Sequence, residues 1–466
     1  MTRSNGTIIG PYRQVPLPEG GQAPFFVVPF DKDGASTGPR TRAALVEAVA
    51  TGQPSHLFIF SHGWNNDWPD AIRKYTAFID GFARTRVEHP LPGRFQPVLV
   101  GIFWPSAILV RDEDKAPAIA GGSPGADDGD GGWLSELMTL AEGVEPASRE
   151  RFYELIQSPG VDADELRELA GMLVPVWAGR SAATEETDEL ESNPSLQVDE
   201  LVDLWHRAEA LEQTDARPGG FSADSVPPGP FAGGPSAAGA PTALSNPMAA
   251  GILDRLNPRN IARTATVLLM KDRAGRVGAR GVSRLLEDVL AATTAPVHLV
   301  GHSYGCKVVM SALCRLSGAA RQVESALLLQ PAMSHLAFAS DVPGLGAPGG
   351  YRPALERSFQ PIRATYSRFD EPLTKFFHLA ARRASDLGEL RIAGAPPSRY
   401  SALGGFGPAD GQGVARVSAE APGTRYELPA GSRIVGVEAS NVISSHSDIN
   451  NRATWWMLAD QVRGRP

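Results

Sequence analysis

The sequence predicts an α/β fold in which a mostly parallel sheet is flanked by helices. Short apolar runs that are typical of buried strands alternate with helical patterns at both ends of the chain. One apolar run, PVHLV at 296–300, leads through a tight glycine-containing turn into the helical pattern of 305–316. Strands that alternate with helices in this way are joined most simply as parallel neighbours.

The first part of the chain contains three strand patterns and two helical patterns. The clearest helix has Ile72, Tyr75, Ile79 and Phe82 spaced so that they share one apolar face. We expect strands at 25–30, 56–60 and 95–103, and helices at 41–50 and 69–86.

The alternation is interrupted by a segment of different composition at 111–247. An acidic, glycine-rich run at 121–132 opens it, and a Gly- and Pro-rich run at about 212–247 is expected to be a flexible linker. We therefore interpret 111–247 as a helical, cap-like insertion. Its expected helices are 133–142, 148–156, 163–173 and 198–211.

Strand and helix patterns resume after the insertion, so the core is predicted to consist of 1–110 and 248–466. The segment GRVGARG at 275–281 is interpreted as a joint between helices, since it lacks the ending of a phosphate-binding loop. The expected strands are 296–300, 325–329, 361–366 and 434–438, and the expected helices are 248–272, 281–292, 305–316 and 453–462.

Composition excludes several classes of protein. The chain has 44 Lys and Arg against 52 Asp and Glu, which argues against general nucleic-acid binding. Two cysteines exclude a disulfide scaffold, and no zinc motif occurs, so no metal or cofactor is expected. No apolar stretch is long enough for a transmembrane segment, and the N-terminus lacks the pattern of a signal peptide. We expect a cytoplasmic protein.

The strongest chemical signal is Gly301-His302-Ser303-Tyr304-Gly305. It lies between a predicted strand and a predicted helix, as the G-x-S-x-G nucleophile elbow requires. Because the turn is tight, small residues are required two positions before and two positions after the serine, where Gly301 and Gly305 stand. The serine hydroxyl would then stand at the carboxyl edge of the sheet, beside a helix N-terminus that favours negative charge.

A nucleophilic serine needs a base, which is most often a histidine. His302 lies inside the elbow and is expected to point away from the site. His378 lies in a helical pattern and is expected to be structural, and His335 is the third alternative. His446 lies in a polar loop after the last strand, from which it could reach over the sheet edge. We therefore expect His446 to be the base.

The candidate acid is Asp370, which follows the predicted strand at 361–366. Sites in open α/β sheets lie at the carboxyl ends of strands. Glu371 is adjacent but would point elsewhere, and Asp448 is too close in sequence to His446.

Backbone N–H groups are expected to stabilise the oxyanion. One is that of Tyr304, directly after the serine, and the other should come from a loop after an early strand. His62-Gly63-Trp64 forms such a loop, in which Gly63 allows a sharp turn and His62 would brace the backbone. The second donor would be the Trp64 N–H.

Five motifs in this order resemble a known family. They are FIFSHGWNND at 58–67, FWPS at 103–106, LVGHSYG at 299–305, YSRFDEPL at 366–373 and SSHSDI at 444–449. Together they resemble the bacterial serine hydrolases of the α/β-hydrolase superfamily that have an HG-aromatic-N oxyanion loop and are related to lipases and esterases. The resemblance covers the core. Such relatives often have Met where this chain has Tyr304, and they do not account for the insertion.

The resemblance implies an α/β-hydrolase fold and a triad of Ser303, Asp370 and His446. It implies cleavage of a small-molecule or lipid ester, with Trp104 and Ser106 as candidate pocket residues and the insertion as a cap. Two alternatives are an exported antibacterial phospholipase or lipase effector, and a non-catalytic binding protein on the same fold.

Overall fold

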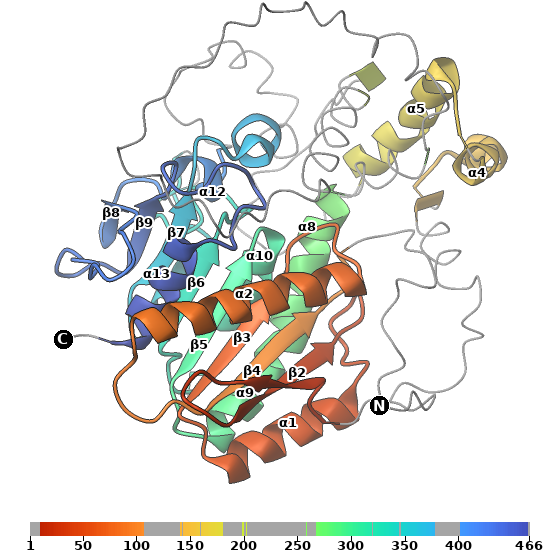
Figure 1. Cartoon of the computed structure of the whole chain (residues 1–466). Coiled ribbons are helices and arrows are strands. Elements are labelled where there is room, and N and C mark those ends of the chain that lie inside the picture. Colours follow the sequence, from red (N-terminus) through yellow and green to blue (C-terminus); the bar gives the residue numbers. More distant parts are fainter. Residues whose placement is uncertain are drawn as a thin grey trace, which may run out of the picture.

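In a computed structural model of the chain, nine strands from the described residues form one sheet (Figure 1). Their order is β1-β2-β4-β3-β5-β6-β7-β9-β8, and only the pair of β1 and β2 is antiparallel. The structure describes residues 10–106, 140–141, 143–158, 160–179, 198–199, 202, 258, 267–318, 320–343, 346–377 and 401–464.

The strands alternate with helices along most of the core, which confirms the predicted α/β class. The strands are β1 (Arg13–Pro16), β2 (Gln22–Pro29), β3 (His56–Ser61), β4 (Pro97–Phe103), β5 (Val297–His302), β6 (Ser325–Leu329), β7 (Ile362–Tyr366), β8 (Val414–Ser418) and β9 (Ile434–Glu438). The longer helices are α1 (Pro39–Gly52), α2 (Trp68–Glu88), α4 (Arg149–Gln157), α5 (Ala163–Gly179), α8 (Val267–Arg276), α9 (Ser283–Ala292), α10 (Tyr304–Cys314) and α13 (Arg452–Val462). Shorter helical turns include η5 (Arg352–Arg357), η6 (Pro372–Phe376) and α12 (Leu403–Phe406).

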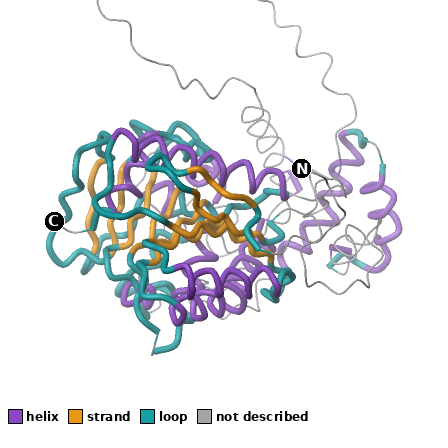
Figure 2. Tube along the Cα trace, turned by 60° about the horizontal axis from the view of Figure 1, so that its bottom comes forward, coloured by secondary structure: helices purple, strands orange, loops and turns teal. Residues whose placement is uncertain are grey.

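The sheet is buried on both faces because apolar residues continue along its central strands. In β3, Leu57 and Ile59 pack with α1, α9 and α10, whereas Phe58 and Phe60 pack with α2 and α13. Successive side chains of a strand point to opposite faces, so an uninterrupted apolar run requires helices on both sides. Figure 2 shows the strands between two layers of helices.

Helix α2 has the apolar face that its residue spacing predicts. Tyr75, Ile79 and Phe82 are buried against the sheet. The helix begins where the Asp67 side chain accepts a hydrogen bond from the Asp70 N–H at 2.9 Å, with proline in the first turn. Burial of each large side chain contributes about 1.5–3 kcal/mol to folding.

Helices α8 and α9 are joined by one π-helical turn, Val277–Val282, which is the glycine-rich segment noted in the sequence. A Cβ atom at Gly278 would lie 2.3 Å from the Val308 carbonyl oxygen of α10. A Cβ atom at Gly281 would lie 2.4 Å from the Gly34 carbonyl oxygen. These glycines allow α10 and the loop after β2 to approach the joint, so the segment serves close packing.

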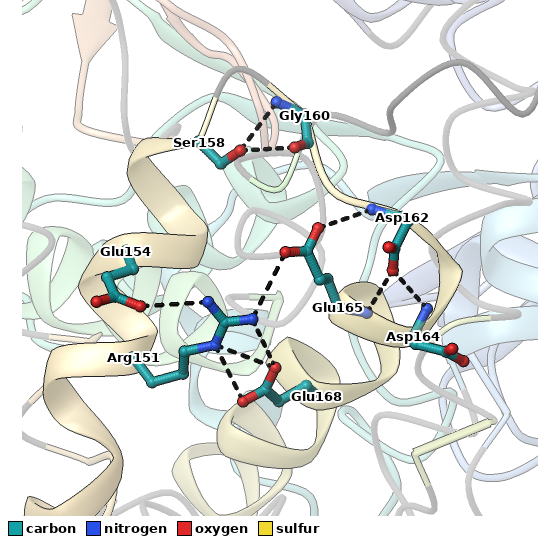
Figure 3. Close-up of polar contacts among 8 residues, drawn as sticks. All are labelled: Arg151, Glu154, Ser158, Gly160, Asp162, Asp164, Glu165 and Glu168. Carbon is teal, nitrogen blue, oxygen red and sulfur yellow. Dashed lines mark hydrogen bonds and ion pairs between the residues drawn. The ribbon is translucent and has the colours of Figure 1, made fainter.

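The described part of the insertion includes the neighbouring helices α4 and α5 (Figure 3). Arg151 of α4 pairs with Glu168 of α5, with Nη2 and Oε2 3.1 Å apart. Asp162 caps α5 by accepting from the Glu165 N–H at 2.9 Å, while the Glu165 carboxylate accepts from the Asp162 N–H at 3.1 Å. Because exposed ion pairs contribute little, the apolar contacts between the helices supply most of their stability. The buried residues are Phe152, Leu155, Ile156, Leu166, Leu169 and Leu173.

Several predicted elements cannot be compared with the structure. The expected helices at 133–142, 198–211 and 248–272 lie largely outside the described residues, and the linker at about 212–247 lies entirely outside them. His378 is also outside. In the part of the chain that is described, no helix is both long enough and apolar enough to cross a membrane.

We predict that Gly278→Ala lowers the free energy of unfolding by about 1–3 kcal/mol, because the new methyl group would overlap the Val308 carbonyl. Urea unfolding followed by circular dichroism measures the change. Gly318→Ala is the matched control, since nothing lies within 4 Å of a Cβ atom there, and it should change stability by less than about 0.5 kcal/mol. Equal stability of the two variants would contradict the packing role of Gly278.

Candidate active site

Ser303 stands in a strained turn between β5 and α10. Its φ is 55° and its ψ is −126°, a conformation that non-glycine residues rarely adopt. The turn is held by two backbone hydrogen bonds, from the Ser303 N–H to the Leu329 carbonyl at 3.1 Å and from the Cys306 N–H to the Ser303 carbonyl at 3.0 Å. The sheet and the first turn of α10 therefore both fix the serine backbone.

The glycines on either side of Ser303 are required by close backbone approach. A Cβ atom at Gly301 would lie 2.7 Å from the Cys306 Cα atom. A Cβ atom at Gly305 would lie 2.2 Å from the Ser61 carbonyl oxygen. Ser61 is the last residue of β3, so α10 begins in direct contact with the end of the neighbouring strand.

Asp370 and His446 come together from the ends of two neighbouring strands, β7 and β9. The His446 Nδ1 and Asp370 Oδ2 atoms are 2.8 Å apart. Asp370 is fully buried, and its other oxygen accepts a hydrogen bond from the Leu373 N–H at 3.0 Å. The structure thus joins the predicted acid to the predicted base, although 76 positions separate them in the chain.

The loop that carries His446 is held by its own side chains. The Asp448 carboxylate accepts hydrogen bonds from the Ser444 N–H and hydroxyl, both at 2.9 Å. Asn451 caps α13 and donates to the Val442 carbonyl at 3.0 Å. Asp448 therefore shapes this loop, and Asp370 is the carboxylate that contacts the His446 ring.

His302 contacts the same loop, which corrects the expectation that it points away from the site. Its Nε2 atom lies 2.9 Å from the His446 carbonyl oxygen and therefore donates to it. The two imidazole rings are 5.0 Å apart, centroid to centroid. Burial lowers the pKa of His302 well below its ordinary value, and nearby His446 lowers it further. His302 is thus a neutral donor beside the elbow.

No hydrogen bond joins the Ser303 hydroxyl to the His446 ring among the described residues. The ring nevertheless lies next to the elbow through its contact with His302. Hydrogen bonds of this kind are often long in the absence of substrate and shorten when substrate binds. The geometry therefore brings the predicted base to the predicted nucleophile without a direct bond between them.

The loop after β3 lies against Ser303. A Cβ atom at Gly63 would be 2.6 Å from the Ser303 Cβ atom, so only glycine permits this approach. Among the described residues, neither the Trp64 N–H nor the Tyr304 N–H has a hydrogen-bond acceptor. These are the two donors that the sequence predicts for an oxyanion.

His62 and Asn66 hold this loop from inside. The Asn66 amide donates to the carbonyls of Gly63 at 2.9 Å and Trp64 at 2.7 Å. The His62 Nδ1 atom lies 3.0 Å from the Gly63 carbonyl oxygen, and the Trp104 N–H donates to His62 Nε2 at 3.3 Å. The neutral His62 ring therefore carries its proton on Nδ1. The carbonyls of Gly63 and Trp64 both accept hydrogen bonds from these side chains.

Trp104 and Ser106 were expected to line a substrate pocket, but both are fully buried beneath the loop. The Trp104 ring stacks on the His62 ring with an interplanar angle of 7°, and its indole N–H donates to the His62 carbonyl at 3.0 Å. The Ser106 hydroxyl donates to the Asn66 carbonyl and accepts from the Asn66 N–H, both at 3.0 Å. Their polar atoms are thus directed to the loop, which they support from below.

Three side chains of the site were not found by sequence reasoning: Asn66, His302 and Gln330. Asn66 and His302 lie within motifs that were recognised, but their partners could not be read from the motifs. Gln330 lies outside every motif, at the end of β6. Its Nε2 atom donates to Asp370 Oδ2 at 2.8 Å.

Comparison of the chain with protein-family models, with curated proteins and with solved structures finds no match. The assignment of chemistry therefore depends on the geometry of the site.

We predict a pH dependence of stability from His62. Burial lowers the pKa of His62 from its ordinary 6.5 to about 3. Below pH 6.5, His62 is therefore protonated in the unfolded chain but stays neutral in the folded chain. The free energy of unfolding consequently decreases as the pH falls from 6.5 towards 3. In His62→Gln this loss should be smaller by up to about 1.4 kcal/mol per pH unit.

Urea unfolding at several pH values in this interval measures the effect. Because other buried histidines also titrate, the comparison is between the slopes of the wild type and the variant. Equal slopes would contradict a neutral, buried His62.

Proposed function

We propose that the chain is a serine hydrolase of the α/β-hydrolase type that cleaves carboxylic esters. The observation that carries the proposal is the strained Ser303 turn, which is packed against the Gly63 loop and lies next to the pair formed by the buried Asp370 and the partly buried His446. A G-x-S-x-G turn between strand and helix, followed in the chain by Asp and then His, is the order of α/β-hydrolases.

Each residue has a defined role in the proposed reaction. The Ser303 hydroxyl attacks the ester carbonyl carbon, and its proton passes to His446 Nε2. Asp370 accepts the Nδ1–H of His446 and stabilises the imidazolium that forms. The N–H groups of Trp64 and Tyr304 donate to the oxyanion. His446 then protonates the departing alkoxide, and water hydrolyses the acyl-enzyme with His446 again acting as base.

A non-catalytic binding protein is the second candidate. The absence of a Ser303–His446 hydrogen bond among the described residues is the one observation that favours it. The strain at Ser303 favours hydrolysis, because backbone strain is retained mainly at functional sites. Labelling of the serine separates the two candidates.

We predict that a fluorophosphonate probe labels Ser303 of the folded, full-length protein. Peptide mapping by mass spectrometry identifies the modified residue. Ser303→Ala should abolish labelling, and Asp370→Asn should slow it by about 10⁴-fold, because the carboxylate no longer orients and stabilises the base. Ser311→Ala, on the same helix, is the matched control and should be labelled at the rate of the wild type.

Circular dichroism establishes that each variant is folded. A folded wild-type protein that is not labelled, even by high concentrations of the probe, would contradict the proposal. If the wild type is labelled, assays of the unlabelled protein with short-chain esters and with phospholipids then distinguish soluble from lipid substrates.

We also predict that Gly63→Ala lowers the labelling rate by about 10²-fold, because the added methyl group would meet the Ser303 Cβ atom and displace the Trp64 N–H. Gly52→Ala is the control, since a Cβ atom at that position meets nothing within 4 Å. Unchanged labelling of Gly63→Ala would mean that the loop does not form the oxyanion site.

A further inference from the structure

Gln330 occupies a strained and buried position directly after β6. Its φ is 46°, in the left-handed region that glutamine rarely adopts, and its side chain is fully buried. Strain of this kind costs about 1–3 kcal/mol and persists only where surrounding contacts enforce it. The chain thus retains a glutamine where glycine would fit the backbone without strain.

The amide of Gln330 is fixed at both ends. The Thr365 hydroxyl of β7 donates to Gln330 Oε1 at 2.9 Å and accepts from the Gln330 backbone N–H at the same distance. In this orientation of the amide, its oxygen contacts Thr365 and its nitrogen contacts Asp370. Gln330 Nε2 donates to Asp370 Oδ2 at 2.8 Å and lies 3.4 Å from the Gly404 carbonyl oxygen.

The Asp370 carboxylate consequently accepts from three directions. Oδ2 receives the Gln330 amide and His446 Nδ1, each at 2.8 Å, and Oδ1 receives the Leu373 N–H at 3.0 Å. Rotation about the Cβ–Cγ bond of Asp370 would move both oxygens away from their donors. The Gln330 amide adds a second donor on Oδ2, the oxygen that faces the histidine, and so further opposes that rotation.

We propose that Gln330 is a positioning residue that fixes the Asp370 carboxylate in the plane in which it orients His446. The inference rests on the proposed function, in which Asp370 orients the base. A neutral amide suits this role, because it satisfies Oδ2 without adding a positive charge that would compete with the imidazolium formed during the reaction.

The test compares Gln330→Met, which keeps the length of the side chain but lacks the donor, with the wild type. The rate of fluorophosphonate labelling at Ser303 should fall by about 10- to 100-fold, as for the loss of other groups that orient a catalytic side chain. Gln360→Met is the matched control, because Gln360 is also a buried, hydrogen-bonded glutamine but lies before β7, at the opposite edge of the sheet. It should be labelled at the wild-type rate.

A double-mutant cycle separates positioning from general support of the fold. If Gln330 acts through Asp370, adding Gln330→Met to Asp370→Asn should cost little further labelling rate. Additive losses would overturn the proposal. If Gln330→Met does not fold, Gln330→Gly replaces it, because glycine accepts the positive φ and lacks the donor.

A spectroscopic measurement does not depend on activity. The low-field proton resonance of His446 Nδ1–H, assigned by its loss in His446→Gln, should move in Gln330→Met and stay in place in Gln360→Met. A wild type that is labelled, together with a Gln330→Met variant that has the wild-type rate and resonance, would overturn this inference and leave the proposed function intact. A folded wild type that is not labelled would overturn the proposed function, and the positioning role of Gln330 with it.

Discussion

The backbone of Ser303 is held at a positive φ between β5 and α10, and the rest of the site is built around this turn. The strain costs about 1–3 kcal/mol, which the surrounding contacts must offset. These contacts are close packing of the backbone around the turn. Helix α10 begins against the carbonyl of Ser61, and the loop at Gly63 packs against the Ser303 Cβ atom. One turn therefore ties β3, β5 and α10 together and leaves no space for side chains at Gly301 or Gly305.

The second constraint is the burial of polar groups. A buried carboxylate such as Asp370 is costly unless hydrogen bonds compensate for the lost water, and the site supplies donors from three different segments. The buried imidazoles of His62 and His302 meet the same constraint by remaining neutral, because burial lowers the pKa of each. They hold the two loops of the site without placing a permanent charge beside the Asp370–His446 pair.

Sequence patterns located the central strands and the helices that cover them, because apolar runs and helical spacing are local signals. They missed β1 and β8, the two edge strands, which are short and only partly buried and therefore carry weak patterns. The resemblance makes Trp104 and Ser106 candidate pocket residues, but their hydrogen bonds go to His62 and Asn66, about 40 positions earlier in the chain.

The sequence by itself determined the α/β class, the turn at Ser303 and the order in which serine, aspartate and histidine follow one another. Only the tertiary structure decided which side chains support them. The contact of Gln330 with Asp370 spans 40 positions, and that of His302 with His446 spans 144. The direction of a side chain at the end of a strand depends on the path of its loop and on the neighbouring strands. That direction is set by packing across the sheet, which no local pattern records.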